Sequence, residues 1–371
     1  MGTPGMYFWI LAGAAFAPAF FSLLCLPALI RYRRKNTEEV ANLPVSLVIA
    51  AKNELENLKV LLPLVLEQNH AEYEVVIVDD RSDDGTYEYL LEQCTQHPAL
   101  RRVRIDETPD HISRKKYALT LGIRACRHDI VLLCDADCRP ASPDWMSLMT
   151  APLAHPEVSF VLGYSQYERR PGFLNLFIRF ETLLTGFRYV ALALMGRPYM
   201  GVGRNLAYRK NVFLANNGFG RYQRLLGGDD DLFVQAHARG SNTRVQIGAD
   251  CLVYSIPETA LGSYFRQKKR HLAISRHYKF SMKILLGLLG ISSILFWPAA
   301  IAAIATENDR SYTIGVIIAY LLLILLPLLV FEKKSGDRTP LVLLPLLDLA
   351  NVVYLAIVGT AALLSRKLKW K

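Results

Sequence analysis

The sequence predicts an α/β domain of the nucleotide-binding type, with transmembrane helices on both sides of it. Apolar stretches long enough to span a bilayer lie towards both ends of the 371-residue chain. Between them, short apolar runs alternate with amphipathic stretches, which is typical of a parallel sheet covered by helices. Acidic pairs directly follow two of the apolar runs. Open α/β sheets bind their ligands at that edge.

Composition supports membrane spans. Hydrophobic residues make up 52% of the chain and the mean hydropathy is +0.20. Lys and Arg exceed Asp and Glu by 10, and many of them flank the apolar stretches. This placement favours anionic lipid headgroups and a phosphate-bearing substrate, so we expect no nucleic-acid partner. The six cysteines show no metal-binding spacing, and we expect reduced thiols.

The first apolar segment covers residues 6–30 and is followed at once by the basic run 31–35. A cleaved signal peptide would carry its charges before the apolar region, so this segment is better interpreted as an anchor. Positive residues beside a span favour the cytoplasmic face. We therefore expect an integral membrane protein of the bacterial inner-membrane type, with residues 1–35 as anchor and the following domain in the cytoplasm.

The α/β pattern begins at residue 43. Runs rich in β-branched and leucine residues predict strands, and apolar residues at helical spacing predict helices. The expected strands are 45–51, 75–78, 103–105 and 129–134, and the expected helices are 54–68, 86–94 and 117–126. A further helix is expected over 173–195. Its mixture of aromatic and charged residues fits either a buried core helix or an interfacial helix against the bilayer.

Three more apolar segments, at 282–305, 311–331 and 341–364, follow a basic amphipathic stretch. Four simple spans would place the basic tail 366–371 outside, against the preference of positive residues for the cytoplasm. Pro345, Asp348 and Asn351 interrupt the last segment, which predicts a bent or re-entrant hairpin. The expected division is therefore a cytoplasmic domain over 43–275 and a membrane domain over 276–371.

Asp135-Ala136-Asp137 ends the strand predicted at 129–134. Mg²⁺ is usually held by one or two carboxylates together with substrate phosphates, so this pair predicts a site for a divalent cation. Two solvated turn aspartates are the alternative. Asp80 follows the strand at 75–78, where a carboxylate can accept from a nucleobase or a ribose hydroxyl.

Three further stretches carry candidate chemistry. Lys115 and Lys116 open a helix, where the dipole disfavours cations, so either an anionic ligand or solvent must offset that cost. The glycines of 199–208 lack the third glycine of a dinucleotide fingerprint and instead indicate close approach of backbone to a substrate. Asp229-Asp230-Asp231 is either a helix N-terminal acid cluster or the source of a general base.

Together these stretches resemble the membrane-bound members of glycosyltransferase family 2, which have the GT-A fold, a Rossmann-like mixed sheet. The resemblance covers about residues 43–275, with the motifs in the family's order. The matching stretches are Ala50-Ala51-Lys52-Asn53-Glu54, Val78-Asp79-Asp80, Lys115 with Ala118-Leu119, Asp135-Ala136-Asp137, Gly201-Val202-Gly203-Arg204-Asn205, Asp229-Asp230 and Gln267-Lys268-Lys269-Arg270-His271.

The resemblance implies a role for each matched residue. Asp135 and Asp137 would bind Mg²⁺ or Mn²⁺. Asp230 would be the general base, with Asp229 as the alternative because an alignment through Asp231-Leu232 shifts by one residue. The implied donor-binding residues are Ala51, Asn53, Glu54, Asp80, Lys115, Asp135 and Arg270. The implied acceptor-side residues are Gly201, Gly203, Asn205, Gln267 and His271.

The implied activity is that of a metal-dependent, hexosyltransferase-type glycosyltransferase. It would transfer a sugar, with inversion, from a nucleoside diphosphate sugar to a lipid or glycan acceptor at the cytoplasmic face. The expected donor is a UDP-sugar. Arg114 stands where the family usually has glycine, and His271 stands where it usually has tryptophan. The absence of that tryptophan argues against processive polymer synthesis. The alternatives are a processive polysaccharide synthase and a non-catalytic, membrane-anchored nucleotide-sugar-binding protein.

Overall fold

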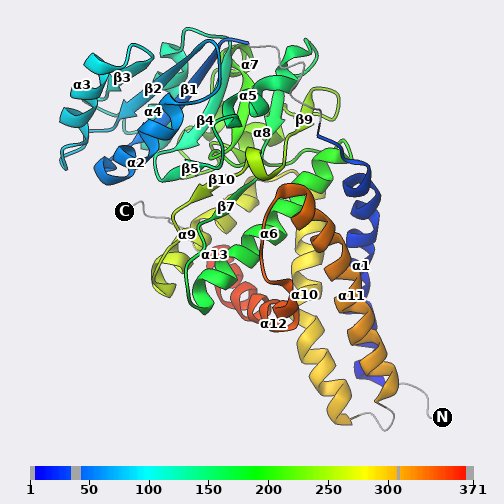
Figure 1. Ribbon diagram of the computed structural model, residues 1–371. Coiled ribbons are helices and arrows are strands. Elements are labelled where there is room, and N and C mark those ends of the chain that lie inside the picture. Colours follow the sequence, from blue (N-terminus) through cyan, green and yellow to red (C-terminus); the bar gives the residue numbers. More distant parts are fainter. Residues whose placement is uncertain (1–4, 35–42, 307–309, 365–371) are drawn as a thin grey trace.

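A computed structural model describes residues 5–34, 43–306 and 310–364 (Figure 1). An α/β domain occupies one end of the molecule and long helices extend from the other. The basic tail 366–371 lies outside the described residues, as does Lys35 of the predicted juxtamembrane run.

The main sheet has seven strands in the order β3-β2-β1-β4-β8-β6-β9. The first four strands along the chain pair in parallel, whereas β8 runs antiparallel to β4 and β6. This confirms the mixed α/β sheet. The strand bounds are β1 (Val45–Ala51), β2 (Tyr73–Asp79), β3 (Leu100–Arg104), β4 (Ile130–Asp135), β6 (Phe160–Leu162), β8 (Leu206–Arg209) and β9 (Thr243–Val245).

The register of the central strands brings their carboxyl ends together. Ala51 of β1 is paired with Asp79 of β2, and Ala50 is paired with Asp135 of β4. The predicted shared edge is therefore present, with the acidic residues of two strands on either side of β1.

Helices cover both faces of the sheet. Of these, α4 packs on β1 and β2 through Gly122, where an added Cβ would lie 2.6 Å from Val48 Cγ1 and 2.9 Å from Val78 Cγ2. This helix begins at Arg114, three residues before the expected start, so Lys115 lies in its first turn. The helix bounds are α2 (Leu55–Leu66), α3 (Thr86–Gln96), α4 (Arg114–Ala125), α5 (Trp145–Thr150), α7 (Lys210–Ala215) and α8 (Asp231–His237).

A second sheet, which the sequence patterns did not predict, lies next to the Asp135 edge. Its three strands, in the order β5-β10-β7, are β5 (Cys138–Pro140), β10 (Val253–Ser255) and β7 (Ser165–Tyr167). Because β5 begins directly after Asp137, the Asp135–Asp137 turn is clamped between two sheets.

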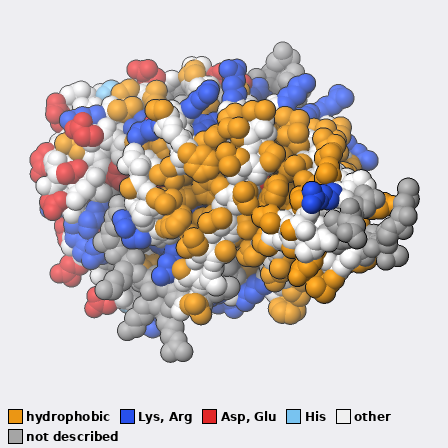
Figure 2. All heavy atoms as spheres, turned by 90° about the horizontal axis from the view of Figure 1, so that it is seen from below, with side chains coloured by type: hydrophobic (Ala, Val, Ile, Leu, Met, Phe, Trp, Pro, Cys, Tyr) orange, Lys and Arg blue, Asp and Glu red, His pale blue; other side chains and the backbone are white. Residues whose placement is uncertain are grey.

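The described residues include four segments that are long and apolar enough to cross a membrane. Three are continuous helices, α1 (Met6–Arg31), α10 (Phe280–Thr306) and α11 (Ser311–Ser335), and α1 packs along the other two. Hydrophobic side chains gather over this end of the molecule, with lysines and arginines at the rim (Figure 2). A membrane protein is the consistent interpretation.

The fourth segment is one continuous helical stretch whose helix type changes along its length. Pro345, Asp348 and Asn351, which were predicted to interrupt it, lie inside its α-helical part. The segment consists of a 3-10 turn (Leu341–Leu343), α12 (Leu344–Tyr354), a π-helical turn (Leu355–Gly359) and α13 (Thr360–Leu364). Figure 1 shows α12 and α13 lying across α6 (Phe173–Leu194) and α9 (Leu261–Ile274) instead of following α10 and α11 to their far ends. Its return to the cytoplasmic face stays a prediction.

Helix α6 (Phe173–Leu194) lies between the domain and the membrane helices. Most of its side chains are buried, and it contacts α1, α11, α12 and β7. Of the two predicted alternatives, a buried core helix and an interfacial helix, this burial fits the buried helix. After it in the chain, α9 (Leu261–Ile274) leads through a short turn into α10.

One link between the membrane helices and the α/β domain lies near the end of α1. The Tyr32 hydroxyl donates to the Ile247 carbonyl at 3.2 Å and accepts the Ile247 N–H at 3.0 Å. Lys334, in the last turn of α11, donates to the Tyr32 carbonyl at 2.8 Å. One residue therefore links two membrane helices to the domain.

Candidate functional site

One cavity of about 1820 Å³ collects most of the predicted site residues. It runs from the carboxyl ends of β1, β2 and β4, past the loop before β8 and helix α9, to the membrane helix α10. The predicted residues that line it are Ala51, Asn53, Glu54, Asp80, Lys115, Asp135, Asp137, Gly203, Asp229, Asp230, Gln267, Arg270 and His271. Gly201 and Asn205 do not line it.

Lys115 joins two acidic stretches that are far apart in the sequence. Its Nζ lies 2.9 Å from Asp135 Oδ1 and 3.5 Å from Asp229 Oδ2. Burial alone would raise the pKa of Asp135, but the charge and hydrogen bond of Lys115 outweigh it and lower that pKa. Asp135 is therefore held ionised before any ligand is present.

Asp137 lies in the same wall and accepts a hydrogen bond from Ser255 Oγ at 3.1 Å. Burial, and then the charge of Asp135, raises the pKa of Asp137. Within the described ranges, no group of three or more His, Cys, Asp or Glu side chains forms a metal site. Two carboxylates facing a large cavity still fit Mg²⁺ or Mn²⁺, because phosphates and water commonly complete the coordination of such ions.

The acid cluster and the glycine loop meet at Asp230. Its Oδ1 accepts the Asp231 N–H at 2.8 Å, at the start of α8, and its Oδ2 accepts the Gly203 N–H at 2.7 Å. Burial, and then the neighbouring Asp229, raises the pKa of Asp230. The carboxylate is thus held in one orientation by two backbone donors.

Asp231 differs from its two neighbours. It is 8% exposed, and it accepts the Tyr278 hydroxyl at 2.5 Å and the Leu232 N–H at 2.9 Å. Burial, and then the charge of Asp230, raises the pKa of Asp231 to about 8. Its contacts join the acid cluster to the turn that leads into α10.

The two lysines at the start of α4 have different environments. Lys116 is 0% exposed, and its Nζ donates to the carbonyls of Tyr222, Leu225 and Gly227 at 2.7–2.8 Å. Lys116 therefore matches neither prediction for this position, a lysine that binds an anion or one that is exposed to solvent. Lys116 instead fixes the loop that precedes the acid cluster.

Asp80 is buried and is paired with Arg81, whose Nη2 lies 2.7 Å from Asp80 Oδ1. Arg81 has a φ of +55°, and its Nη2 also donates to Thr108 Oγ1 at 3.0 Å. Asn53 has the same φ, and its side chain accepts the Asp83 N–H at 3.0 Å. Arg81, which was not among the predicted site residues, holds the Asp80 carboxylate through their ion pair.

Asn205 lies beneath the glycine loop and is 0% exposed. Its Nδ2 donates to the carbonyls of Tyr164 and Cys251 at 2.7 and 2.8 Å, and its Oδ1 accepts from Trp145 Nε1 at 3.0 Å. Its amide therefore supports the loop from below. The predicted acceptor-side role of Gly201 and Asn205 stays a prediction.

Arg204 is a further cavity-lining residue that the predicted set omitted, although it stands inside the glycine motif. Its guanidinium lies 4.7 Å from the centre of the Tyr167 ring. Together with Lys115 and Arg270, it brings positive charge to the region of Asp135 and Asp137.

A buried polar network forms another part of the wall. Asp337, in the turn after α11, lies 2.9 Å from Arg179 Nη2 and accepts the Tyr164 hydroxyl at 2.8 Å. Gln166 of β7 also donates to Asp337. Since Tyr164 lines the cavity, the network connects that wall to the membrane helices.

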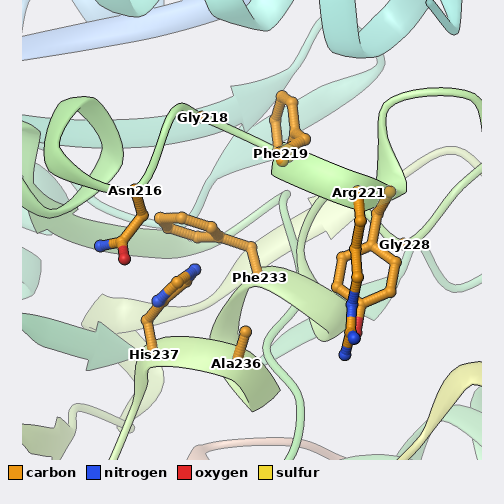
Figure 3. A pocket seen from close by; sticks show the side chains of 10 residues that line it. Asn216, Gly218, Phe219, Arg221, Gly228, Phe233, Ala236 and His237 are labelled. Carbon is orange, nitrogen blue, oxygen red and sulfur yellow. The ribbon is translucent and has the colours of Figure 1, made fainter.

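A second cavity of about 250 Å³ lies between α7 and α8 (Figure 3). Asn216, Phe233 and His237 lie close together there, with the Phe233 and His237 rings 5.0 Å apart. None of the predicted site residues lines it. The larger cavity is therefore the candidate active site.

Comparisons with known proteins bear on the family and the fold of the chain. The family model described as Glycosyl transferase family 2 matches residues 46–214. Glycosyltransferase AglE of Haloferax volcanii is 29% identical over 125 residues, which are 33% of this chain and 40% of that protein. The fold is similar to that of a solved structure, the mannosyltransferase PcManGT from Pyrobaculum calidifontis in complex with GDP-Man and Mn²⁺. That likeness covers 98% of this chain and 100% of the other, with a TM-score of 0.64 and 19% identity.

Proposed function

We propose, from the premise that this chain belongs to the family 2 glycosyltransferases, that it transfers a sugar from a nucleoside diphosphate sugar to a membrane-associated acceptor. The observation that carries the proposal is the meeting of Lys115, Asp135 and Asp229 in one cavity. That arrangement places fixed positive and negative charge beside the strand edge where open α/β sheets bind nucleotides.

The donor would lie along that edge. Asp80, held by Arg81, would accept from the base or the ribose. Lys115 and Arg270 would offset the charge of the departing diphosphate, with Arg204 contributing to the same field. A Mg²⁺ or Mn²⁺ ion bound by Asp135 and Asp137 would supply further positive charge at the leaving group.

Asp230 would act as the general base. It would take the proton from the acceptor hydroxyl as that oxygen attacks the anomeric carbon, which gives inversion in a single displacement. A base must be positioned within hydrogen-bond reach of the proton that it accepts. The two backbone N–H groups that hold Asp230 are suited to that positioning. Asp229 is the alternative base, although it is already in contact with Lys115.

The acceptor would be lipid-borne and presented at the cytoplasmic face. Support comes from the cavity lining, which continues from the acid cluster to Leu286, Ile291 and Ile294 of α10. A hydroxyl on a membrane lipid could enter from that side without leaving the bilayer surface. The proposed division of the chain is an anchor at 1–35, a catalytic domain at 43–275 and a membrane domain at 276–371.

The test uses the full chain in lipid nanodiscs with a panel of UDP- and GDP-sugars, a total lipid extract, and Mg²⁺ or Mn²⁺. Mass spectrometry of the lipid fraction should show one sugar added per acceptor, with loss of activity on chelation. A ladder of products would instead indicate a processive polysaccharide synthase. Donor binding without transfer or hydrolysis under every condition would indicate a binding protein and would end the proposal.

A further inference from the structure

We propose that the membrane end of the large cavity binds a lipid whose headgroup carries a phosphate. Arg188 and Lys283 would bind the phosphate, and the apolar chain would lie in a groove between α10 and residues 355–362. The groove is lined by Leu286, Gly287, Gly290, Ile291 and Ile294 on α10, and by Leu355, Ala356, Gly359, Thr360 and Ala362 on the other side. This inference rests on the proposed function, because it assigns the acceptor side of that site.

The groove has room for an apolar chain because its walls carry glycine. An added Cβ at Gly287, Gly290 or Gly359 would have no other atom within 4 Å. Ile291, next to Gly290 on α10, is 60% exposed. The groove is therefore open along a helix that is long and apolar enough to span a bilayer, where the hydrocarbon chain of a lipid is the ligand of matching chemistry.

The charges at this end are unbalanced. Arg188 and Lys283 line the cavity, and neither side chain has a hydrogen bond or ion pair with any of the described residues, although Arg188 is within electrostatic range of Asp348. Arg276 lines it too and donates to the Ala362 carbonyl. The acidic residue that α6 contributes to the lining is Glu181, which is already paired with Lys268. Excess positive charge beside an apolar groove favours an anionic ligand.

The two observations together select a phospholipid-type headgroup. A free phosphate would satisfy the cations but would leave the apolar groove unused. A neutral lipid would fill the groove but would leave Lys283 and Arg188 without a hydrogen-bonded anion, because the Asp348 carboxylate that attracts Arg188 is already bonded to Trp297 and Tyr320. A phosphate joined to a hydrocarbon chain satisfies both, and a hydroxyl beyond the phosphate would then extend towards Asp230.

The first experiment measures binding directly, in nanodiscs that contain the full chain. The probe is phosphatidic acid with a photoreactive diazirine in its acyl chain, and the comparison probe is diacylglycerol with the same chain. Mass spectrometry should place the phosphatidic acid label on residues 280–294 and 355–362, about tenfold above the diacylglycerol label, the scale expected for hydrogen bonds to a charged group. The double variant Arg188→Ala with Lys283→Ala should abolish that excess, whereas Lys333→Ala, an exposed lysine outside the cavity, should keep it.

The second experiment fills the groove. Gly290→Leu should reduce transfer to the lipid extract at least about tenfold, because a buried apolar chain is displaced. Gly315→Leu is the matched control, since Gly315 of α11 also has no atom within 4 Å of an added Cβ and does not line the cavity. Equal losses in the two variants would overturn the groove assignment.

Two further outcomes separate the sources of the phosphate and the two proposals. Inorganic phosphate at millimolar concentration should leave the phosphatidic acid label in place, and full displacement would show a site for free anions and overturn the lipid assignment. If labelling depends on Arg188, Lys283 and Gly290 but no sugar is transferred from any donor, the lipid site stands and the proposed function is rejected. If sugar is transferred to lipid equally well in the Arg188, Lys283 and Gly290 variants, the proposed function stands and the lipid site is rejected.

Discussion

The two ends of the large cavity differ in how their charges are balanced. At the strand edge, Lys115 contacts both Asp135 and Asp229, so positive and negative groups are paired within the protein. At the membrane end, Arg188 and Lys283 have no ion pair among the described residues. Paired charges keep one geometry before a ligand arrives, which is what a reaction centre requires. Cations without an ion pair can take their counter-charge from an anionic ligand, and this favours binding of such ligands over neutral ones.

The largest expected effect tests the paired end. Asp230→Asn should lower turnover by ~10²–10⁴, the usual scale for loss of a general base, while donor affinity measured by calorimetry stays nearly unchanged. Asp229→Asn should instead weaken donor binding, because Asp229 shares Lys115 with Asp135. Near-normal turnover in Asp230→Asn would transfer the role of base to Asp229.

The wall that joins the two ends should be the next most sensitive. Asp337→Asn removes the charge partner of Arg179, and the two side chains are 1% and 6% exposed. An uncompensated buried charge costs about 3–5 kcal/mol, so the unfolding temperature in detergent should fall strongly. Glu157→Gln breaks the exposed pair with Arg244 and serves as the control, with an expected change below about 1 kcal/mol. A small effect of Asp337→Asn would show that the wall does not depend on this network.

Neighbouring lysines allow a sharper version of the comparison. Lys115→Met should weaken donor binding by about tenfold or more, since it removes a charge-assisted contact. Lys116→Met should leave donor affinity nearly unchanged and should lower the free energy of unfolding by about 1–3 kcal/mol, because three buried carbonyls lose their donor. Donor titration and thermal unfolding on both variants test this, and similar profiles for the two would contradict the assignment.

The remaining prediction concerns the pH dependence of stability at the acid cluster. The pKa of Asp231 is about 8 in the folded protein, against about 3.9 for an unfolded chain. Between these values the folded state binds more protons, so the contribution of Asp231 to stability falls as pH rises from about 4 to 8 and is flat above. Unfolding temperatures across this range should show a slope that Asp231→Asn reduces. An unchanged slope would assign it to other groups.

The strand-edge end could be predicted from sequence because its signal is local. Runs of β-branched residues closed by acids placed Asp80 and Asp135 at one edge. The register pairs Asp79, which precedes Asp80, and Asp135 with adjacent residues of β1, and both Asp80 and Asp135 line the cavity. Lys116 could not be assigned in the same way, since the carbonyls that it binds lie 106, 109 and 111 positions later. Asn205 likewise forms its contacts across distant segments.

The membrane end could not be predicted from hydropathy. Gly290 and Gly359 are ordinary residues of apolar segments, and only the packing of α10 beside the last segment places them in one groove. Pro345 and Asp348, which were predicted to interrupt that segment, lie inside α12. The change of helix type comes later, at the π-helical turn Leu355–Gly359, which contacts α9 and α10 and has no signal in the sequence.

The bonds of Tyr32 with Ile247 and Lys334 have a consequence for acceptor choice. Together with the Arg179–Asp337 pair, they fasten α1 and α11 to the domain, and under the proposed function they would hold the reaction centre at a constant height over the lipid surface. A fixed distance between the site and the bilayer would select acceptors by length, because correct placement of the reacting atoms contributes much of the rate. A carrier whose reactive hydroxyl stands too near the lipid surface, or too far from it, would then be rejected by its length alone, whatever its chemistry.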